Sequence, residues 1–427
     1  MSAPRGRLGL FDATMIVMGG IVGAGIFMNP YVVARRAGTP ARILLAWVLG
    51  GLVALAGAFI WAELAARRPA AGGQYAYLRE AFGPLPAFLY GWTLLLVVQS
   101  GGMAAVAMTF ARYALDLAGG GPREGAVAAA ALLGLTAVNC LGVRWGSGVQ
   151  NALMVLKLLA IGGLVAFGLL AVPSASGAAA AAPPGLASLG AALVPVLFAY
   201  GGWQTATFVA AEMRRPERDL PRGLLLGMAG VVAVYLAVNA VCVRALGADG
   251  LAATTTPASD VMRRALGEPG ARAIALGIAV STLGFLSQSI LTAPRVYFAM
   301  AADGVLPRVI GTRHPRTEAP VAAIVLQGIV ATVVALSGRY EQILSYVVSV
   351  DMLFFAATAA GLFVLRRREG GAPRHRVPGH PWTTAAFVAA CLLVALSAVL
   401  DAPANTAVGL GILLSGVPVY HLWRRSA

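Results

Sequence analysis

The chain has 427 residues, of which 59% are hydrophobic and only 11% are charged, and its formal net charge is +15. Soluble domains carry about 25% charged residues, so this composition indicates an integral membrane protein. The basic residues form short clusters between apolar segments, without interleaved aromatic residues, which argues against nucleic-acid binding. The three cysteines each lie inside an apolar segment, which excludes a disulfide framework and a zinc site.

Membrane-spanning helices need about 20 mostly apolar residues. This criterion predicts an all-α protein with twelve transmembrane helices, in chain order at residues 11–34, 43–66, 86–114, 125–142, 147–172, 189–212, 223–246, 271–299, 320–337, 342–365, 383–400 and 405–423. No small-residue cleavage site follows the first segment, so we expect a retained span and not a signal peptide. The distribution of arginines between the spans favours a multi-pass protein of the inner (plasma) membrane with both termini cytoplasmic.

The first predicted span contains the stretch "MIVMGGIVGAGIFMNP", residues 15–30, with a glycine cluster in its middle. A break inside a span exposes backbone groups that hydrocarbon cannot satisfy, so a break is tolerated only inside protein or beside a wet cavity. Close helix packing through small residues explains one such cluster equally well. A second cluster, Gly201 and Gly202 in "LFAYGGWQTATFVAAEM", occurs five spans later. Paired breaks at matching positions indicate an inverted-repeat transporter with its site at the membrane midplane.

The two breaks predict the chemistry of that site. Freed N–H groups at the start of the second half of the first span suit a carboxylate, and they belong to Ala24, Gly25 and Ile26. Freed carbonyl groups in the sixth span suit an ammonium group, and they belong to Phe198, Ala199 and Gly201. A carboxylate and an ammonium group held close together describe an α-amino acid.

Two connections carry further expectations. The uncharged, Ala/Pro-rich segment 173–188 suits an outer connection between two halves, and the outer segment 247–270 is long enough for a short surface helix. The amphipathic stretch "AAGGQYAYLREAFGP" follows the second span and predicts a helix at the inner side.

Four stretches, "GGIVGAGIFMNP", "LFAYGGWQTATFVAAEMRRPERDLPRG", "STLGFLSQSILTAPRVYFAMAADGVLP" and "ILSYVVSVDMLFFAATAAGLFVLRRR", resemble the amino acid-polyamine-organocation superfamily, and within it the L-type amino acid transporter branch. The resemblance extends over nearly the whole chain. It implies a five-plus-five inverted repeat of the leucine-transporter-like fold, with discontinuous helices 1 and 6. The repeats would occupy residues 11–172 and 189–365, followed by two helices at 383–423. The implied function is sodium-independent transport of neutral L-amino acids by alternating access, most often as an exchanger.

The same resemblance implies roles for individual residues. Gly23, Ala24 and Gly25 would form the carboxylate-binding break, Phe198 would close over the substrate from outside, and Gly201 would lend a carbonyl to the amine. Trp203 would lie just beyond the second break. Tyr235 would reach the carboxylate side of the site, although a buried tyrosine that serves packing alone is the alternative.

Two departures from the family pattern matter. The loop "DLAGGGPRE" lacks the cysteine that links animal members to a glycoprotein, so we expect no disulfide-linked heavy subunit and a prokaryotic protein. The family's glycine-serine-glycine is glycine-alanine-glycine here, which removes a hydroxyl group.

Lys157 is the only lysine of the chain and lies in the middle of the fifth predicted span. Ionisable groups at such a depth are functional by default, with snorkelling to an interface as the alternative. The resemblance implies that the ammonium group replaces a sodium ion, bridging the backbone at Gly20 to Gly23 and the polar residues of span eight, Ser281 among them. A buried lysine also loses its proton readily, so proton-coupled amino acid uptake with Lys157 as proton carrier remains the alternative.

The remaining polar residues of the spans give weaker signals. Gln99 and Gln288 are candidates for the pocket, although hydrogen bonds between helices explain them equally well. Asp351 is a further candidate, for which a structural pairing is the favoured interpretation and recognition of a cationic substrate is the alternative. Glu63 lies beside an arginine cluster, which predicts an inner salt bridge. The sequence contains no H-E-x-x-H motif, no histidine within a span and no filter repeat, which argues against an enzyme, a metal site, a cofactor or a channel.

Overall fold

The computed structural model describes residues 8–68, 72–121, 123–140, 147–175, 186–312, 314, 319–338, 340–369 and 375–426. Within these ranges the chain is helical, apart from one isolated bridge between Leu8 and Met213. The helices are α1 (Leu10–Ile21), α2 (Gly25–Ala37), α3 (Pro40–Arg67), α4 (Gln74–Phe82), α5 (Pro84–Thr93), the π-helix η1 (Leu94–Val98), α6 (Gln99–Leu117), α7 (Glu124–Cys140), α8 (Ser147–Leu170), α9 (Leu186–Tyr200), the 3₁₀-helix η2 (Trp203–Glu212), α10 (Pro216–Ala253), α11 (Pro257–Thr292), α12 (Pro294–Ala302), the 3₁₀-helix η3 (Arg308–Gly311), α13 (Val321–Ser337), α14 (Tyr340–Glu369), α15 (Trp382–Asp401) and α16 (Pro403–Ser426).

Local sequence explains where many of these helices begin. Proline has a fixed φ suited to a helix and no N–H group to satisfy, so it favours the first turn. Helices α3, α5, α10, α11 and α12 all begin at proline. The α2 helix ends where Gly38 adopts the left-handed conformation, with φ of 74°.

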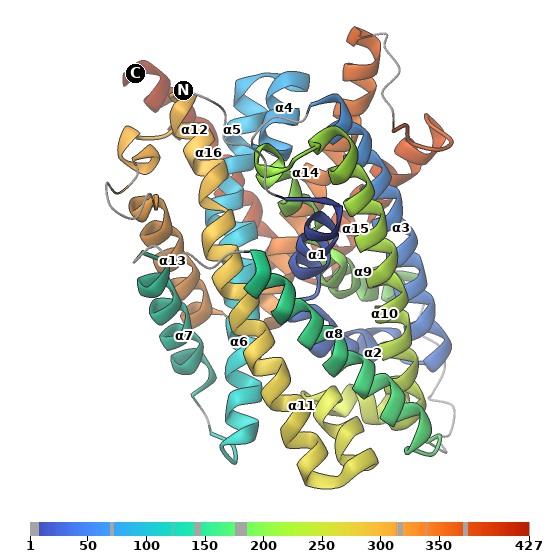
Figure 1. Ribbon diagram of the computed structural model, residues 1–427. Coiled ribbons are helices and arrows are strands. Elements are labelled where there is room, and N and C mark those ends of the chain that lie inside the picture. Colours follow the sequence, from blue (N-terminus) through green and yellow to red (C-terminus); the bar gives the residue numbers. More distant parts are fainter. Residues whose placement is uncertain are drawn as a thin grey trace.

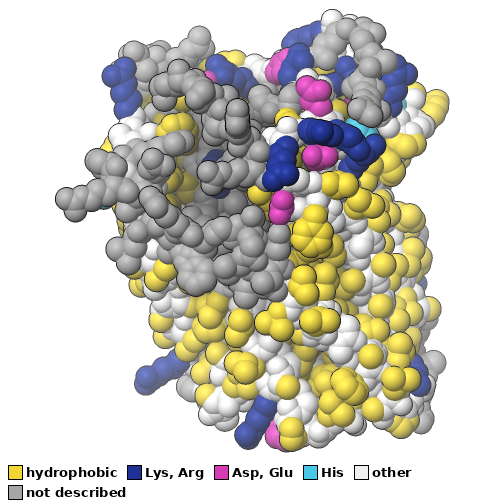
Figure 2. Space-filling view, in the orientation of Figure 1, with side chains coloured by type: hydrophobic (Ala, Val, Ile, Leu, Met, Phe, Trp, Pro, Cys, Tyr) yellow, Lys and Arg dark blue, Asp and Glu magenta, His cyan; other side chains and the backbone are white. Residues whose placement is uncertain are grey.

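The described helices are those of a membrane protein. Seven of them are long and apolar enough to cross a bilayer, and the bent pair α1–α2 makes an eighth. Shorter apolar helices cover Glu124–Cys140, Met154–Leu170 and Val321–Ser337. Apolar side chains dominate the middle of the visible face, whereas charged side chains gather toward its upper end (Figure 2). The twelve segments expected from the sequence all coincide with helical segments, although length and apolar composition alone qualify only seven or eight of them as spans.

The bundle brings the two broken segments together. Helix α1 packs against η2 and α10, and α2 packs against α9, so both halves of the first segment touch the second one. Helix α8 runs obliquely across α10 and α11 and also contacts α1 (Figure 1). Helix α14 packs against α6 and α9 and completes the surroundings of the breaks.

Two connections were expected to contain short helices. The segment 247–270 is helical at residues 248–253 and 257–266, and non-helical glycines set both stretches apart from the long parts of α10 and α11, which agrees with the expected short helix. Turns occur inside these helices at Gly247 and Gly267, whose φ angles of 71° and 70° only glycine adopts readily. The amphipathic stretch after the second span contains α4, as expected.

Candidate substrate site

The first break separates α1 from α2, whose axes are bent by 41°. Gly25 begins α2 at a point where this helix touches α9. A Cβ atom at Gly25 would lie 2.5 Å from the Cα atom of Ala199, closer than such atoms approach in proteins. Glycine is therefore required here for backbone contact between the two broken segments.

The second break is the turn Gly201–Gly202 between α9 and η2. Gly202 has φ of 113°, in the left-handed region, and a Cβ atom there would overlap the carbonyl oxygen of Gly20. A Cβ atom at Gly201 would meet only carbonyl groups of its own turn, the nearest at 3.3 Å. Close packing therefore explains the glycines at positions 25 and 202. Both glycines also lie at helix breaks, so the two explanations are compatible.

Each break leaves backbone groups unused. The N–H groups of Ala24, Gly25 and Ile26 have no acceptor within the part of the chain that the structure describes. The carbonyl groups of Ala199 and Gly201 likewise accept no hydrogen bond from described residues.

The carbonyl group of Phe198 differs from the expectation. It accepts the N–H group of Gly201 over 3.2 Å, because the end of α9 tightens by one residue at the turn. This carbonyl therefore already has a partner.

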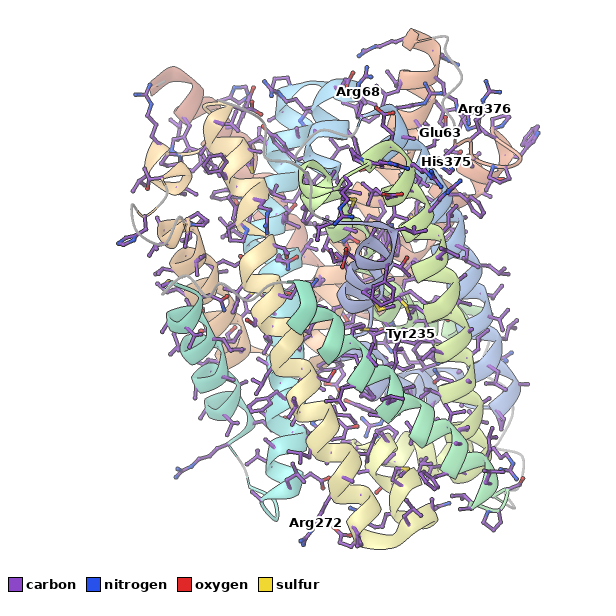
Figure 3. The ribbon with its side chains drawn as sticks, viewed as in Figure 1. Glu63, Arg68, Tyr235, Arg272, His375 and Arg376 are labelled. Carbon is purple, nitrogen blue, oxygen red and sulfur yellow. The ribbon has the colours of Figure 1, made fainter. Side chains whose placement is uncertain are left out.

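Side chains of two neighbouring helices donate hydrogen bonds to backbone carbonyls at the first break. The Nζ atom of Lys157 on α8 donates to the carbonyl of Val22 over 2.5 Å, and the hydroxyl of Tyr235 on α10 donates to the carbonyl of Ile21 over 3.0 Å. Tyr235 lies at mid-height of the bundle, with Glu63 and Arg68 near one end and Arg272 near the other (Figure 3). The break that Tyr235 contacts is therefore in the middle of the bundle.

Both breaks line one cavity with about 840 Å³ of empty space. Its walls come from the two breaks and from α6, α11 and α14. The predicted residues that line it are Gly23, Ala24, Gly25, Phe198, Ala199, Gly201, Gln99, Gln288 and Asp351.

Three predicted substrate-site residues do not line this cavity. Ile26 and Tyr235 are fully buried behind the first break. Trp203 is packed between Trp61 and Phe355, with ring centroids 6.1 and 4.9 Å away. These side chains support the walls of the cavity from behind.

Lys157 and Ser281 line a second, smaller cavity of about 320 Å³ together with Gly19. The hydroxyl of Ser281 is buried and has no hydrogen-bond partner among the described residues. Phe285 and Gln288 line both cavities, so these side chains of α11 separate them.

Sequence reasoning missed several residues of the site. Thr205 lines the main cavity, and its hydroxyl donates to the carbonyl of Gly202 over 2.7 Å. A hydroxyl three residues after a glycine turn is a recognisable signal for such a contact. Phe285 is one helical turn before Gln288, so the helix period places both on one face. The π-helix η1, which precedes Gln99, has no comparable signal in the sequence.

Ion pairs lie toward both ends of the bundle. The carboxylate of Glu63 accepts hydrogen bonds from Arg67, Arg366 and the N–H group of Val377 at 2.5–3.0 Å. This pairing agrees with the expectation of a salt bridge at Glu63. At the opposite end, Arg112 pairs with Glu124 through two hydrogen bonds of 2.9 and 3.1 Å.

An apolar helical bundle with two broken helices around a central cavity defines a membrane transport protein. The amino acid permease family matches residues 8–420, and the chain belongs to this family, in the L-type branch of the amino acid-polyamine-organocation superfamily. The chain is therefore an amino acid transporter and not an enzyme.

The similarity to individual relatives covers most of the chain. The chain is 31% identical to the human large neutral amino acids transporter small subunit 2, over 98% of this chain and 81% of that protein. It is 31% identical to the serine/threonine exchanger SteT of Bacillus subtilis, over 97% of this chain and 96% of that protein. The human cystine/glutamate transporter is 29% identical over 98% of this chain and 85% of its own length.

Proposed function

We propose that the protein exchanges neutral L-amino acids across the plasma membrane by alternating access, without sodium. The N–H groups of Ala24, Gly25 and Ile26 bind the substrate carboxylate, and the carbonyl groups of Ala199 and Gly201 bind its ammonium group. Phe198, which lies in the cavity wall and contacts Tyr340 edge-to-face at 6.5 Å, closes over the bound substrate.

The observation that carries this proposal is the pair of breaks facing one cavity with complementary unused groups. Hydrogen-bond donors at the start of α2 favour an anion, because the helix dipole adds to them. Carbonyl groups at the end of α9 favour a cation for the same reason. Two relatives, the large neutral amino acids transporter small subunit 2 and the serine/threonine exchanger SteT, agree by name with this substrate class.

In this proposal Lys157 acts as a fixed replacement for a sodium ion. Lys157 is 8% exposed, and its ammonium group donates to the carbonyl of Val22, at the point where α1 ends. The same side chain lines the small cavity together with Ser281 of α11, but it makes no hydrogen bond to the Ser281 hydroxyl, so the expected bridge to α11 is not formed in this structure. Movement of α1 and α2 during transport then requires the contact between Lys157 and Val22 to change.

The proposed architecture has twelve spans in two inverted repeats, residues 11–172 and 189–365, followed by two helices at 383–423. Both termini are cytoplasmic. We expect no disulfide-linked heavy subunit, because the loop at residues 116–124 contains no cysteine.

Uptake into proteoliposomes tests the function. Purified protein is reconstituted with or without an internal neutral amino acid, and uptake of the labelled amino acid is measured with external sodium or choline. Exchange predicts uptake only with internal amino acid and no effect of choline. Uptake into vesicles that contain no amino acid would contradict exchange, and loss of uptake in choline would contradict sodium independence.

Proton-coupled uptake is the second candidate, because Lys157 is a buried titratable group beside the moving break. It predicts accumulation driven by a pH gradient in vesicles without internal amino acid, and loss of that response in Lys157→Gln. The same vesicles, with an imposed pH gradient, therefore decide between the two candidates.

A further inference from the structure

We propose that Asp351 is a specificity-determining residue that admits amino acids with a cationic side chain. The inference rests on the proposed function, because it assumes that the substrate backbone is held at the two breaks. It widens the proposed substrate range from neutral amino acids to those whose side chain ends in an ammonium or guanidinium group.

The first argument is the lack of a partner for Asp351. Two acidic side chains are buried among the described residues, Glu63 and Asp351. The carboxylate of Glu63 is surrounded by two arginines and a backbone N–H group. Asp351 is 8% exposed, its Oδ1 atom is buried without a hydrogen-bond partner, and it pairs with no arginine, lysine or histidine of the described residues.

An unpaired buried carboxylate is costly, so such a group either takes up a proton or receives a partner. The nearby protein groups supply no charge. The hydroxyl of Tyr90 is buried, interacts electrostatically with Asp351 and has no hydrogen-bond partner among the described residues. A neutral hydroxyl does not compensate a carboxylate. Because Asp351 lines the cavity, a cation that enters it can supply this partner.

The second argument is where Asp351 lies. It lines the main cavity from α14, and the polar residues Gln99 of α6 and Gln288 and Thr292 of α11 line the same cavity. The two breaks line the same cavity from other elements. A substrate whose carboxylate and ammonium groups are bound at the breaks has only its side chain left to reach α14.

The third argument is the charge of the cavity. Among the described lining residues Asp351 is the only charged side chain, and the other polar ones are amides and hydroxyls. Lys157, the buried cation of the region, lines the smaller cavity and already donates to Val22. The zwitterionic backbone of a bound amino acid adds no net charge to the cavity. A cationic substrate side chain would therefore balance the negative charge of Asp351.

The test compares L-arginine with L-citrulline, which has nearly the same shape but carries a neutral urea group in place of the guanidinium. Binding of each to purified wild-type protein, Asp351→Asn and Asp401→Asn is measured by competition with a labelled neutral amino acid. Asp401 is the control, because it pairs with Arg36 over 2.7 Å outside the cavity. The same unit charge is removed in both variants.

We expect wild-type protein and Asp401→Asn to bind arginine at least about tenfold more tightly than citrulline, as a charge-assisted bond requires. In Asp351→Asn the preference should disappear, while citrulline and the neutral amino acid bind as in the wild type. These neutral ligands also report whether the variant is folded.

Equal binding of arginine and citrulline by the wild type would overturn the inference alone, since binding of neutral amino acids would still support the proposed function. A preference for arginine that persists in Asp351→Asn would also overturn it. Wild-type protein that binds no amino acid would overturn the proposed function, and the inference with it.

Discussion

Replacing Lys157 with methionine removes the ammonium group and keeps an unbranched, flexible side chain. In the structure the Nζ atom donates to the carbonyl of Val22 over 2.5 Å in a buried environment. A hydrogen bond to a charged group contributes about 1.5–3 kcal/mol. A change of 1.4 kcal/mol corresponds to a factor of ten in an equilibrium constant. Loss of this bond therefore lowers the population of the conformation in which Lys157 binds Val22 by about 10- to 150-fold.

We expect the rate of amino acid exchange to fall by a factor in this range, because the proposed binding site of the substrate carboxylate begins directly after Val22. The assay is uptake of a labelled neutral amino acid into proteoliposomes loaded with the same amino acid. Leu156→Met is the matched control, since Leu156 is the preceding residue of α8 and is 56% exposed on the outside of the bundle. It should exchange at the wild-type rate.

Thermal unfolding of each variant separates loss of transport from loss of folding. The reasoning would be refuted by folded Lys157→Met that exchanges at the wild-type rate. Equal losses in Lys157→Met and Leu156→Met would also refute it, because Leu156 does not contact the break.

Three further predictions concern folding and coupling. Gly202→Ala should lower the thermal unfolding temperature strongly, because its Cβ atom would overlap the carbonyl oxygen of Gly20. Gly102→Ala is the control and should not lower this temperature, because no atom lies within 4 Å of its new Cβ atom. Equal unfolding temperatures of the two variants would show that the two broken segments can move apart. Glu63→Gln should cost about 3–5 kcal/mol of stability, because it removes the buried carboxylate that pairs with Arg67 and Arg366. Glu217→Gln at an exposed site should cost little, and a denaturant titration that gives the same value for both variants would contradict a structural ion-pair network. Replacing external sodium by choline should leave uptake unchanged, and collapse of uptake would mean that Lys157 does not occupy the place of a cation.

The sequence by itself determined the class of protein and the position of the breaks. The apolar composition required a membrane protein, because so few charged residues cannot cover a soluble surface. Glycine clusters inside apolar segments located both breaks to within a few residues, because a span tolerates weak helix formers only where backbone is needed for contact or binding.

Only the tertiary structure decided which of the predicted residues line the main cavity and which line the smaller cavity of Lys157. Periodicity did not show that Gly25 and Gly202 touch the opposite broken segment, since backbone contacts depend on packing between α2 and α9 and between α1 and η2. Neither did it show that Phe285 separates the cavity of Lys157 from the main one. The lack of a partner for Asp351 depends on every helix around it, because a partner can come from any of them.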